Sequence, residues 1–435
     1  NLAISIAEKI GYFTGKEAKN IGLNWLLAPV CDINNNSNNS VINLRAWGEE
    51  PEIVENLTSA FQRGVSSSKM MTCAKHFPGH GNSEIDSHLD LPEIQNDLSK
   101  LEKFELIPFK SLIKQGVNSV MIGHLLFPKI DPIYPATLSK KLVTDLLRVK
   151  LKYDGLVVSD ALVMNAISDK YSSANAAVMA FDAGIDLIMM PKDIDEAINS
   201  LTDAFYSEKI SLERLHLARE RRRKQLDLVS NENELKKEEL MNEDIKNKFL
   251  LDAFMFSNYI IKNSIFVRGE NTIKAEINDI NLIQIDNFDQ ASNKLFPALD
   301  LPKTAGFVNL IIHPLGISPW QKANKKKLEL EHFGNSKMLV QIFVRGKPFI
   351  GLDYRSDHWI DALKKLEFEE RLSGIIIYGC PYLYDKIKKT IHESIPLAYS
   401  PSQSEEAQKQ ILSRILQAKI ARKENEKNLS KEFTD

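Results

Sequence analysis

GLVVSD, at residues 155–160, is an apolar run that ends in a single carboxylate, Asp160. Strands that are buried on both faces have such continuous apolar runs, without the alternation of apolar and polar residues seen in half-buried strands. Four other runs share this character: LNWLLAPV at 23–30, MMTCA at 70–74, VNSVMI at 117–122 and IDLIMM at 185–190. The segments between them have helical periodicity, which predicts strands that pair in parallel through helical crossovers.

Polar residues follow most of these predicted strands. They are Cys31-Asp32, Lys75-His76, His124 and Asp160. In a parallel barrel the carboxyl ends of the strands share one face, and catalytic groups collect there. A doubly wound open sheet also binds ligands at its strand ends, but usually at one switch point. Polar groups at successive strand ends therefore favour an α/β protein built on a TIM-like (β/α)8 barrel.

The length of the chain, 435 residues, allows about two or three domains. We expect the barrel at residues 1–229, with a cationic closing helix at its end, and a charged helical linker at 230–250. Six further apolar runs between residues 264 and 400 predict a smaller α/β sandwich domain at 251–422, followed by a polar tail at 423–435. Because Asn1 stands directly in a helical pattern, we expect a fragment whose barrel lacks its N-terminal strand or strands.

Charge and hydropathy exclude some classes of protein. The 56 basic and 58 acidic side chains give a net charge of −2, so no basic excess indicates binding to nucleic acid. No apolar run reaches the roughly 18 residues that a membrane span needs. The cysteines, Cys31, Cys73 and Cys380, are few and far apart, which argues against a disulfide scaffold and fits a reducing compartment. We therefore expect a cytoplasmic protein.

The stretch TCAKHFPGHGNSEIDSHLD, residues 72–90, combines histidines and carboxylates in a way that suggests a metal site. His76, His80 and His88 could ligate a metal together with Asp86 and Asp90. The first two histidines have the spacing of a zincin helix, but a Pro-Gly pair at 78–79 breaks any helix between them. We therefore do not favour a metal. We interpret His80 as a histidine that hydrogen-bonds loop backbone, between two glycines that form a turn.

Acid–base chemistry is the second interpretation of this stretch. Asp86 and His88 stand two residues apart, so their side chains can share one side of an extended loop. A carboxylate next to an imidazole orients the ring and stabilises its protonated form. Asp160 is suited to attack an electrophilic carbon at the mouth of the predicted barrel. From the residues alone two alternatives stay open: an ordinary surface loop at Asp-Ser-His, and Asp160 as the N-cap of a helix that starts near Ala161.

Taken together, these residues resemble glycoside hydrolase family 3, and specifically its β-N-acetylglucosaminidase (β-hexosaminidase) branch. The resemblance is carried by AKHFPGHGNSEIDSHLDLP and GLVVSDALVMNAI. Supporting segments follow in the family's order: LNWLLAPVCDIN, VINLRAWGEEPEIV, VMIGHLLFPKIDPIYPATLSKKLV and AGIDLIMMP. The resemblance covers the residues from 1 to about 230, whereas the second domain is only loosely similar to the family's C-terminal domain.

The resemblance implies a retaining glycosidase that needs no cofactor. Asp160 matches the family's catalytic nucleophile, which forms a covalent glycosyl-enzyme intermediate. His88 matches the general acid/base, and Asp86 matches the carboxylate that pairs with it. The implied substrate is an oligosaccharide or muropeptide that contains N-acetylglucosamine.

The resemblance also implies sugar-binding residues. Lys75 and His76 match residues that hydrogen-bond the hydroxyls of the bound sugar. Arg45, in the segment Arg45-Ala46-Trp47-Gly48, matches a substrate-binding arginine. Without the resemblance to the family, we would expect Arg45 to form an ion pair at the surface. We interpret His124 as a structural residue or as one that supports the site without contacting the sugar.

Other functions remain as alternatives. A family-related β-glucosidase is disfavoured, because an enzyme whose acid lies in its second domain has no use for the Asp-Ser-His loop. An N-acetylglucosaminide phosphorylase differs only in the acceptor, phosphate instead of water. A non-catalytic sugar-binding homologue need not keep Asp160, Asp86 and His88 together, and a metalloenzyme is the remaining alternative.

Overall fold

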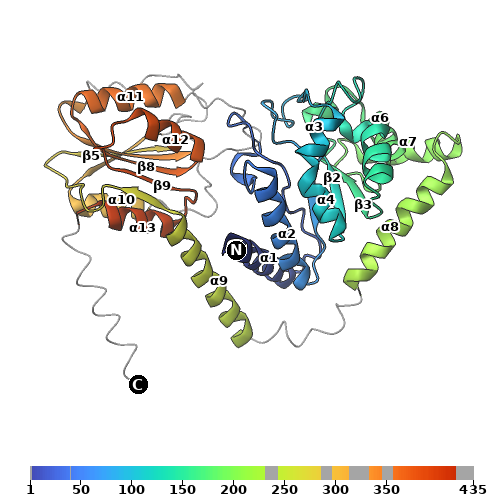
Figure 1. The fold of residues 1–435 in the computed structure, drawn as a ribbon, viewed down its shortest axis with the longest axis horizontal. Helices are drawn as coiled ribbons and strands as arrows, with labels where there is room; N and C mark the ends of the chain where they lie inside the picture. The colour runs from blue at the N-terminus through green and yellow to red at the C-terminus, as the bar shows by residue number, and fades with distance from the viewer. Residues whose placement is uncertain are drawn as a thin grey trace. The chain divides into compact units, whose positions relative to one another are not determined.

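The computed structural model describes residues 2–39, 41–230, 243–285, 296–312, 333–344 and 356–417 (Figure 1). Contacts divide the chain into two compact units, the first reaching Phe249 and the second starting at Leu250. Most of the predicted linker at 230–250 and all of the predicted tail at 423–435 lie outside the described residues. None of the described helices is long and apolar enough to cross a membrane.

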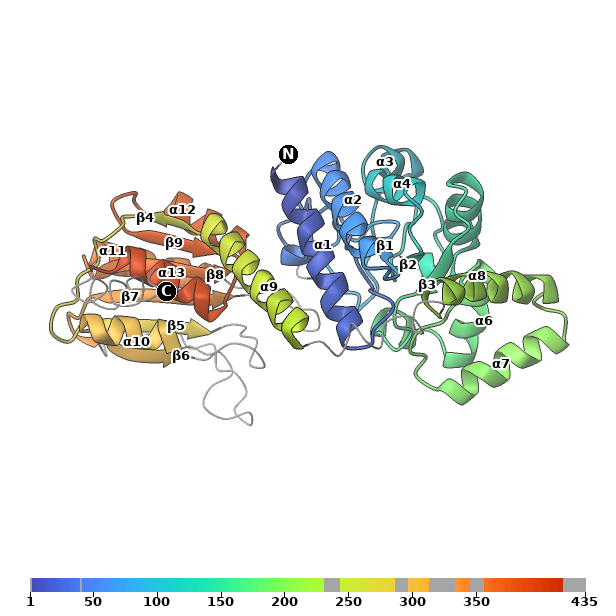
Figure 2. The same cartoon turned by 90° about the horizontal axis from the view of Figure 1, so that it is seen from below.

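The first unit alternates strands and helices along the chain. Its strands are β1 (Cys73–Phe77), β2 (Ser119–Ile122) and β3 (Leu156–Ser159). Its α-helices are α1 (Leu2–Asn20), α2 (Pro51–Ser67), α3 (Leu98–Lys103), α4 (Leu106–Lys114), α5 (Asn165–Ser168), α6 (Ser173–Ala183), α7 (Ile194–Tyr206) and α8 (Leu212–Ser230). Two 3-10 turns and one π-helix complete it: η1 (Asn43–Arg45), η2 (Ala136–Leu138) and η3 (Lys141–Lys150). Helices α1 and α2 lie side by side (Figures 1 and 2).

Local sequence signals set the ends of several helices. The hydroxyl of Ser172 accepts a hydrogen bond from the Asn175 N–H at the start of α6. Gly184 ends that helix with a φ of 119°, a left-handed conformation that glycine adopts without strain. Asp193 caps α7 by accepting from the N–H of Glu196. Helix α6 thus ends just before the predicted strand at 185–190, and α7 begins just after it.

The three strands form one parallel sheet in the order β1-β2-β3. The run at 23–30 joins the free side of β1 through parallel bridges from Trp25 to Met71 and from Val30 to Lys75. On the other side, Leu187 bridges Val158 in parallel. All five apolar runs therefore lie side by side in chain order, and the predicted parallel α/β arrangement is confirmed.

Closure of this sheet into a barrel is not confirmed. A closed barrel requires its first and last strands to pair, so that no edge remains. Among the described residues, the run at 23–30 forms no bridge with the run at 185–190. The structure thus supports a parallel α/β sheet and leaves the (β/α)8 barrel as an expectation.

Both faces of the sheet are buried, which explains the continuous apolar runs. On one face, strand residues such as Ala74, Val120 and Val157 belong to a core that includes side chains of α4, η3 and α6. On the other face, a smaller cluster gathers residues from all five runs: Trp25, Leu27, Cys73, Met121, Val158, Leu187 and Met189. A strand that is covered on both sides has no solvent-facing position that would call for a polar side chain.

A buried carboxylate, Asp186, holds helix α8 against this sheet. It is 7% exposed and lies next to the start of β3, where it accepts a hydrogen bond of 3.0 Å from the N–H of Val157. Arg148 of η3 and Arg214 and Arg221 of α8 form ion pairs with its two oxygens. The cationic segment at 209–229 is therefore partly turned inward, because two of its arginines reach this carboxylate.

Replacement of Asp186 by alanine is expected to lower the free energy of unfolding of the first unit by about 3–5 kcal/mol, because three largely buried guanidinium groups lose their shared partner. Urea unfolding measures the change. The matched control is Asp182→Ala, since Asp182 pairs with Lys140 at 2.8 Å but both side chains are exposed. That variant is expected to lose about 1 kcal/mol or less. Equal losses in the two variants would contradict a stabilising role for the Asp186 cluster.

The second unit is a six-stranded sheet with helices on both faces (Figure 1). Its strands are β4 (Phe266–Arg268), β5 (Ile280–Ile285), β6 (Val308–Ile312), β7 (Met338–Val344), β8 (Leu372–Gly379) and β9 (Leu397–Ser400). Its helices are α10 (Phe296–Ala305), α11 (Ser356–Phe368), α12 (Pro381–Thr390) and α13 (Glu405–Ile415), together with most of α9 (Glu243–Ser264), which crosses the boundary between the units. The strand order is β4-β9-β8-β7-β5-β6, and only β4 pairs antiparallel.

Each of the six later apolar runs contributes one of these strands. One core packs against α11 and α12, through residues such as Trp359 and Leu383. The other packs against α10 and α13, through residues such as Ala298 and Ile411. The predicted second α/β domain is thus a helix–sheet–helix sandwich.

Candidate active site

The polar residues that follow the strands of the first unit gather at the carboxyl edge of its sheet. His76 lies within β1, close to its end, and His124 and Asp160 follow β2 and β3. Asp32 follows the run at 23–30, which pairs in parallel beside β1. Because these neighbouring segments run in the same direction, their polar ends meet at one edge.

Asp160 is a partly buried carboxylate directly after β3. Its Oδ1 accepts a hydrogen bond of 2.8 Å from the N–H of Ala161. Helix α5 begins only at Asn165, and its N-cap residue is Met164. The alternative interpretation of Asp160 as a helix N-cap is therefore wrong, since the residue precedes a turn and not a helix.

The surroundings of Asp160 favour its ionised form. Burial alone would raise the pKa of this carboxyl. The imidazoles of His76 and His124 outweigh that effect, with help from the Ala161 N–H and the Lys75 ammonium, and they hold the pKa below its usual value. Asp160 is thus a carboxylate at neutral pH, as a nucleophile must be.

Asp86 and His88 form a hydrogen-bonded pair. Oδ1 of Asp86 accepts from Nδ1 of His88 at 2.7 Å and from the backbone N–H of His88 at 2.8 Å. Asp86 is buried, whereas the side chain of His88 is 16% exposed. The loop that carries the pair contacts the segment after Asp160, because the carbonyl of Ser87 accepts from the N–H of Ala166. The carboxylate of Asp86 thus orients the imidazole of His88 through its Nδ1.

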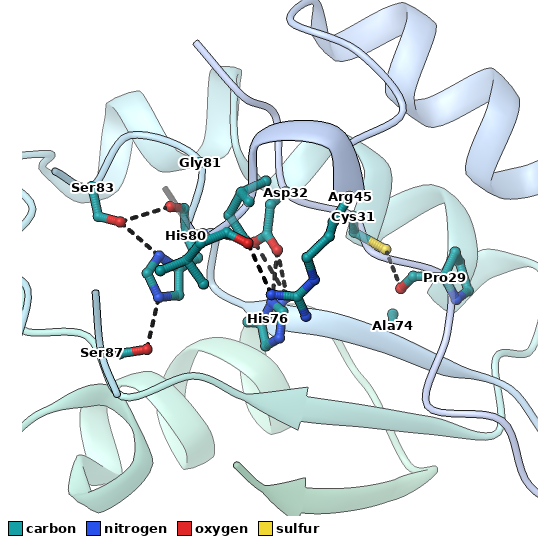
Figure 3. Close-up of polar contacts among 12 residues, drawn as sticks. Pro29, Cys31, Asp32, Arg45, Ala74, His76, His80, Gly81, Ser83 and Ser87 are labelled. Atoms are coloured by element: carbon teal, nitrogen blue, oxygen red, sulfur yellow. Dashed lines mark hydrogen bonds and ion pairs between the residues drawn. The ribbon is translucent and has the colours of Figure 1, made fainter. Parts of the chain in front are cut away.

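A second carboxylate–imidazole contact joins Asp32 to His76 (Figure 3). Oδ2 of Asp32 lies 2.7 Å from Nδ1 of His76, and both residues are buried. Sequence reasoning placed Asp32 at a strand end but gave it no role. The available signal was its position directly after an apolar run, the same signal that identified Asp160.

Lys75 precedes His76 in β1 and is half-buried. Burial lowers the pKa of its ammonium group below the usual value, and the positive charge of Arg45 lowers it further. Arg45, at the end of η1, donates a hydrogen bond of 3.0 Å to the carbonyl of Val41. Its guanidinium forms no ion pair within the described residues, so the surface ion pair considered as an alternative is absent from that part of the chain.

His124 is fully buried and touches the backbone beside Asp160. Its Nε2 lies 3.0 Å from the carbonyl oxygen of Ala161, and its Nδ1 lies 2.7 Å from the hydroxyl of Thr137. Burial lowers the pKa of this imidazole, so it is neutral at neutral pH. Because a carbonyl only accepts, Nε2 donates to Ala161. The predicted structural role of His124 agrees with these contacts.

His80 also has a structural role, although the hydrogen-bond partners of its ring differ from the predicted ones. Both ring nitrogens contact hydroxyls, Ser83 at 2.7 Å and Ser87 at 3.0 Å, instead of loop backbone (Figure 3). Burial lowers the pKa of this imidazole to about 4, so it is neutral at neutral pH. The ring therefore fastens the loop that leads to His88.

Glycine is required on both sides of His80, but for different physical reasons. Gly79 has a φ of 135° and forms the predicted turn. Gly81 is required by close packing, since a β-carbon there would lie 1.7 Å from the carbonyl oxygen of Ile33.

No group of three or more His, Cys, Asp or Glu side chains among the described residues is arranged to hold a metal ion.

Electrostatics link these residues into one group. The pKa of His124 responds to Asp160, His76 and His88, and the pKa of Lys75 responds to Asp160 and Arg45. Asp160, His76 and His88 therefore lie within electrostatic reach of His124, and Asp160 and Arg45 lie within reach of Lys75. An ionised carboxylate and a carboxylate-bound imidazole at one sheet edge are the groups needed for nucleophilic and acid–base catalysis.

Comparison with known proteins gives the family to which this α/β fold belongs. The model of the glycosyl hydrolase family 3 N-terminal domain matches residues 1–223. The model of the bacterial glycosyl hydrolase family 3 C-terminal domain matches residues 272–417. The chain belongs to glycoside hydrolase family 3.

Curated relatives of this chain include proteins named β-hexosaminidase. β-Hexosaminidase A of Pseudoalteromonas piscicida is 35% identical over 230 residues, which are 48% of this chain and 38% of the relative. The β-hexosaminidase of Chromobacterium violaceum is 36% identical over 195 residues, 45% of this chain and 54% of the relative. The matched part of the chain thus spans about half the length of these curated relatives or less.

A solved structure extends the likeness to both units. The family 3 β-N-acetylglucosaminidase from Paenibacillus sp. FPU-7 is 25% identical, with a TM-score of 0.75. The alignment covers 96% of this chain and 80% of that protein.

Proposed function

We propose that the protein is a retaining, exo-acting β-N-acetylglucosaminidase that hydrolyses terminal N-acetyl-β-glucosaminides. Its membership of family 3 and its likeness to proteins named β-hexosaminidase support this substrate class. One observation carries the mechanism: the Asp86–His88 pair, with a contact of 2.7 Å, lies on a loop bonded to the segment after Asp160.

The first half of the reaction uses Asp160 and His88 together. Protonated His88 donates its Nε2 proton to the glycosidic oxygen, so that the leaving group departs as an alcohol. At the same time a carboxylate oxygen of Asp160 attacks the anomeric carbon and forms the glycosyl-enzyme ester. Asp86 keeps the imidazole in position and stabilises its positive charge before the transfer.

The second half regenerates the enzyme. Neutral His88 accepts a proton from water through Nε2, and the resulting hydroxide attacks the anomeric carbon. The bond to Asp160 breaks, the carboxylate is restored, and the sugar leaves with its β configuration retained. Retaining glycosidases usually hold two carboxyl groups about 5–5.5 Å apart. In this proposal the Asp86–His88 pair replaces the second carboxyl.

Lys75, His76 and Arg45 bind the sugar in this account. Their polar groups suit hydrogen bonds to hydroxyl groups, and the positive charge of Lys75 stabilises the carboxylate of Asp160 before attack. The natural ligand is then an oligosaccharide or muropeptide ending in N-acetylglucosamine.

The finer fold assignment is part of the same proposal. We place the catalytic barrel at 1–229, a linker at 230–250 and the second domain at 251–422. The cluster that gathers side chains from all five parallel runs supports a curved sheet, as in the filled interior of a (β/α)8 barrel.

Hydrolysis of aryl glycosides tests the proposed function. We expect the full-length protein to cleave a 4-nitrophenyl N-acetyl-β-glucosaminide with a kcat/KM at least about 100-fold above that for the matching glucoside, because a site that hydrogen-bonds a substrate group rejects the analogue without it. A preference for the glucoside would favour the β-glucosidase alternative. No turnover of either would favour a sugar-binding homologue.

Product analysis separates hydrolysis from phosphorolysis. In phosphate buffer we expect free N-acetylglucosamine as the product, at the same rate as in a buffer without phosphate. Formation of the sugar 1-phosphate would identify a phosphorylase instead.

A further inference from the structure

We propose that Asp32 is a positioning residue that fixes the ring and the protonation pattern of His76, so that the two form a second carboxylate–imidazole dyad beside Asp86–His88. The inference rests on the proposed function, because that function assigns His76 to a hydroxyl of the bound sugar.

The geometry of Asp32 is that of an anchor (Figure 3). Its side chain is fully buried. Oδ2 lies 2.7 Å from Nδ1 of His76, and Oδ1 accepts from the N–H of His80 at 2.7 Å. The backbone N–H of His76 lies 3.2 Å from both oxygens. One carboxylate thus holds the imidazole and the backbone on both sides of the turn at Gly79.

The charge of Asp32 determines which nitrogen of His76 carries the proton. Burial alone would raise the pKa of this carboxyl, but the imidazole of His76 and the contacts with His80 lower it below its usual value. The group is therefore ionised at neutral pH. An ionised carboxylate only accepts hydrogen bonds, so Nδ1 of His76 must donate.

The opposite nitrogen is then presented to the site. His76 is only 5% exposed, yet its Nε2 has no hydrogen-bond partner within the described part of the chain. His80 differs, because both of its ring nitrogens contact serine hydroxyls. With Nδ1 protonated, Nε2 of a neutral His76 accepts a hydrogen bond, which matches the O–H donor of a sugar hydroxyl.

Asparagine at position 32 tests this assignment with little change in shape. The amide oxygen of Asp32→Asn can still accept from His80, but the NH2 group at the Oδ2 position donates toward Nδ1. The ring proton of His76 then moves to Nε2, and the acceptor that faces the sugar is lost. We expect kcat/KM for the aryl N-acetyl-β-glucosaminide to fall about 10- to 100-fold, the loss typical of one hydrogen bond to a charged or oriented group.

A double-mutant cycle shows whether Asp32 acts through His76. His76→Ala alone is expected to lose a similar factor, and adding Asp32→Asn to it should lower kcat/KM by no more than about twofold further. The matched control is Ser139→Ala, which removes another short buried contact, the 2.6 Å hydrogen bond that the Ser139 hydroxyl donates to Asp131. It should stay within about threefold of the wild type.

Ring 15N chemical shifts of histidine-labelled protein provide a readout that does not need activity. The signals of His76 are assigned by their absence in His76→Ala. We expect the proton on Nδ1 in the wild type and on Nε2 in Asp32→Asn.

These outcomes separate the inference from the function on which it rests. Inactive wild-type protein would overturn the proposed function, and the 15N shifts would still test the dyad. An active wild type with Asp32→Asn within threefold of it, additive losses in the cycle, or a proton on Nε2 in the wild type would each overturn the dyad.

Discussion

Asp160→Asn is expected to lower kcat for every N-acetyl-β-glucosaminide by about 10⁴-fold or more, because an amide cannot form the glycosyl ester that the reaction requires. The fold should survive, since the amide oxygen can still accept the N–H of Ala161 that Oδ1 accepts at 2.8 Å. Initial rates with a 4-nitrophenyl glycoside measure the loss, and the unfolding midpoint checks the fold.

The control for this variant is the same substitution at an exposed position nearby. Asp169 ends helix α5 and is exposed, so Asp169→Asn should retain activity within a few-fold. The pH profile adds a second check, because the lowered pKa of Asp160 keeps the nucleophile ionised in mild acid. Protonation of this carboxylate should therefore reduce kcat/KM only at a pH below the usual titration range of an aspartate. Substantial activity in Asp160→Asn would contradict the assigned nucleophile.

His88→Ala is expected to have the second-largest effect, and one that depends on the leaving group. A disaccharide needs a proton on its departing oxygen, so kcat/KM should fall by about 10³-fold, within the range of general acid catalysis. The 2,4-dinitrophenolate group of an aryl glycoside leaves without needing a proton. For that substrate kcat/KM should therefore fall by less than about tenfold. The comparison uses kcat/KM because it reports the glycosylation step even when hydrolysis of the intermediate limits kcat.

The two substrates serve as controls for each other in this experiment. A general loss of structure would reduce both values equally, and so would a role for His88 in binding alone. Equal losses would therefore refute His88 as the general acid.

Much of the site could be predicted because its signals are local in the sequence. Apolar runs followed by polar residues indicated that Asp160 and His124 stand at strand ends, and parallel pairing brings those ends to one edge. Asp86 and His88 are two residues apart, so their contact of 2.7 Å needs only a short turn. The six later runs likewise indicated the strands of the second unit.

Other features depend on contacts that the sequence does not record. Asp32 and His76 are separated by 44 positions, and only the folded sheet brings them within 2.7 Å. The sequence could not show whether the ring of His80 bonds to serine hydroxyls or to the backbone, because either kind of group can form a hydrogen bond with a ring nitrogen. The N-cap alternative for Asp160 failed since α5 begins at Asn165, and helix boundaries are weakly marked in sequence.

Barrel closure is the fold prediction that the structure does not confirm. Runs of apolar residues indicate strands that are covered on both faces, but an open parallel sheet between helix layers meets the same condition. The distinction requires a pairing between the first and the last strand, and sequence patterns within each strand carry no information about it.

The central claim is that Asp160 becomes covalently attached to the sugar during turnover. A 5-fluoro N-acetylglucosaminyl fluoride tests it directly, because the ring fluorine slows both steps while the fluoride leaving group favours the first. After digestion in acid, mass spectrometry should find one added sugar on the peptide that contains Asp160. Attachment to another peptide, or full activity with no labelled peptide, would contradict the account.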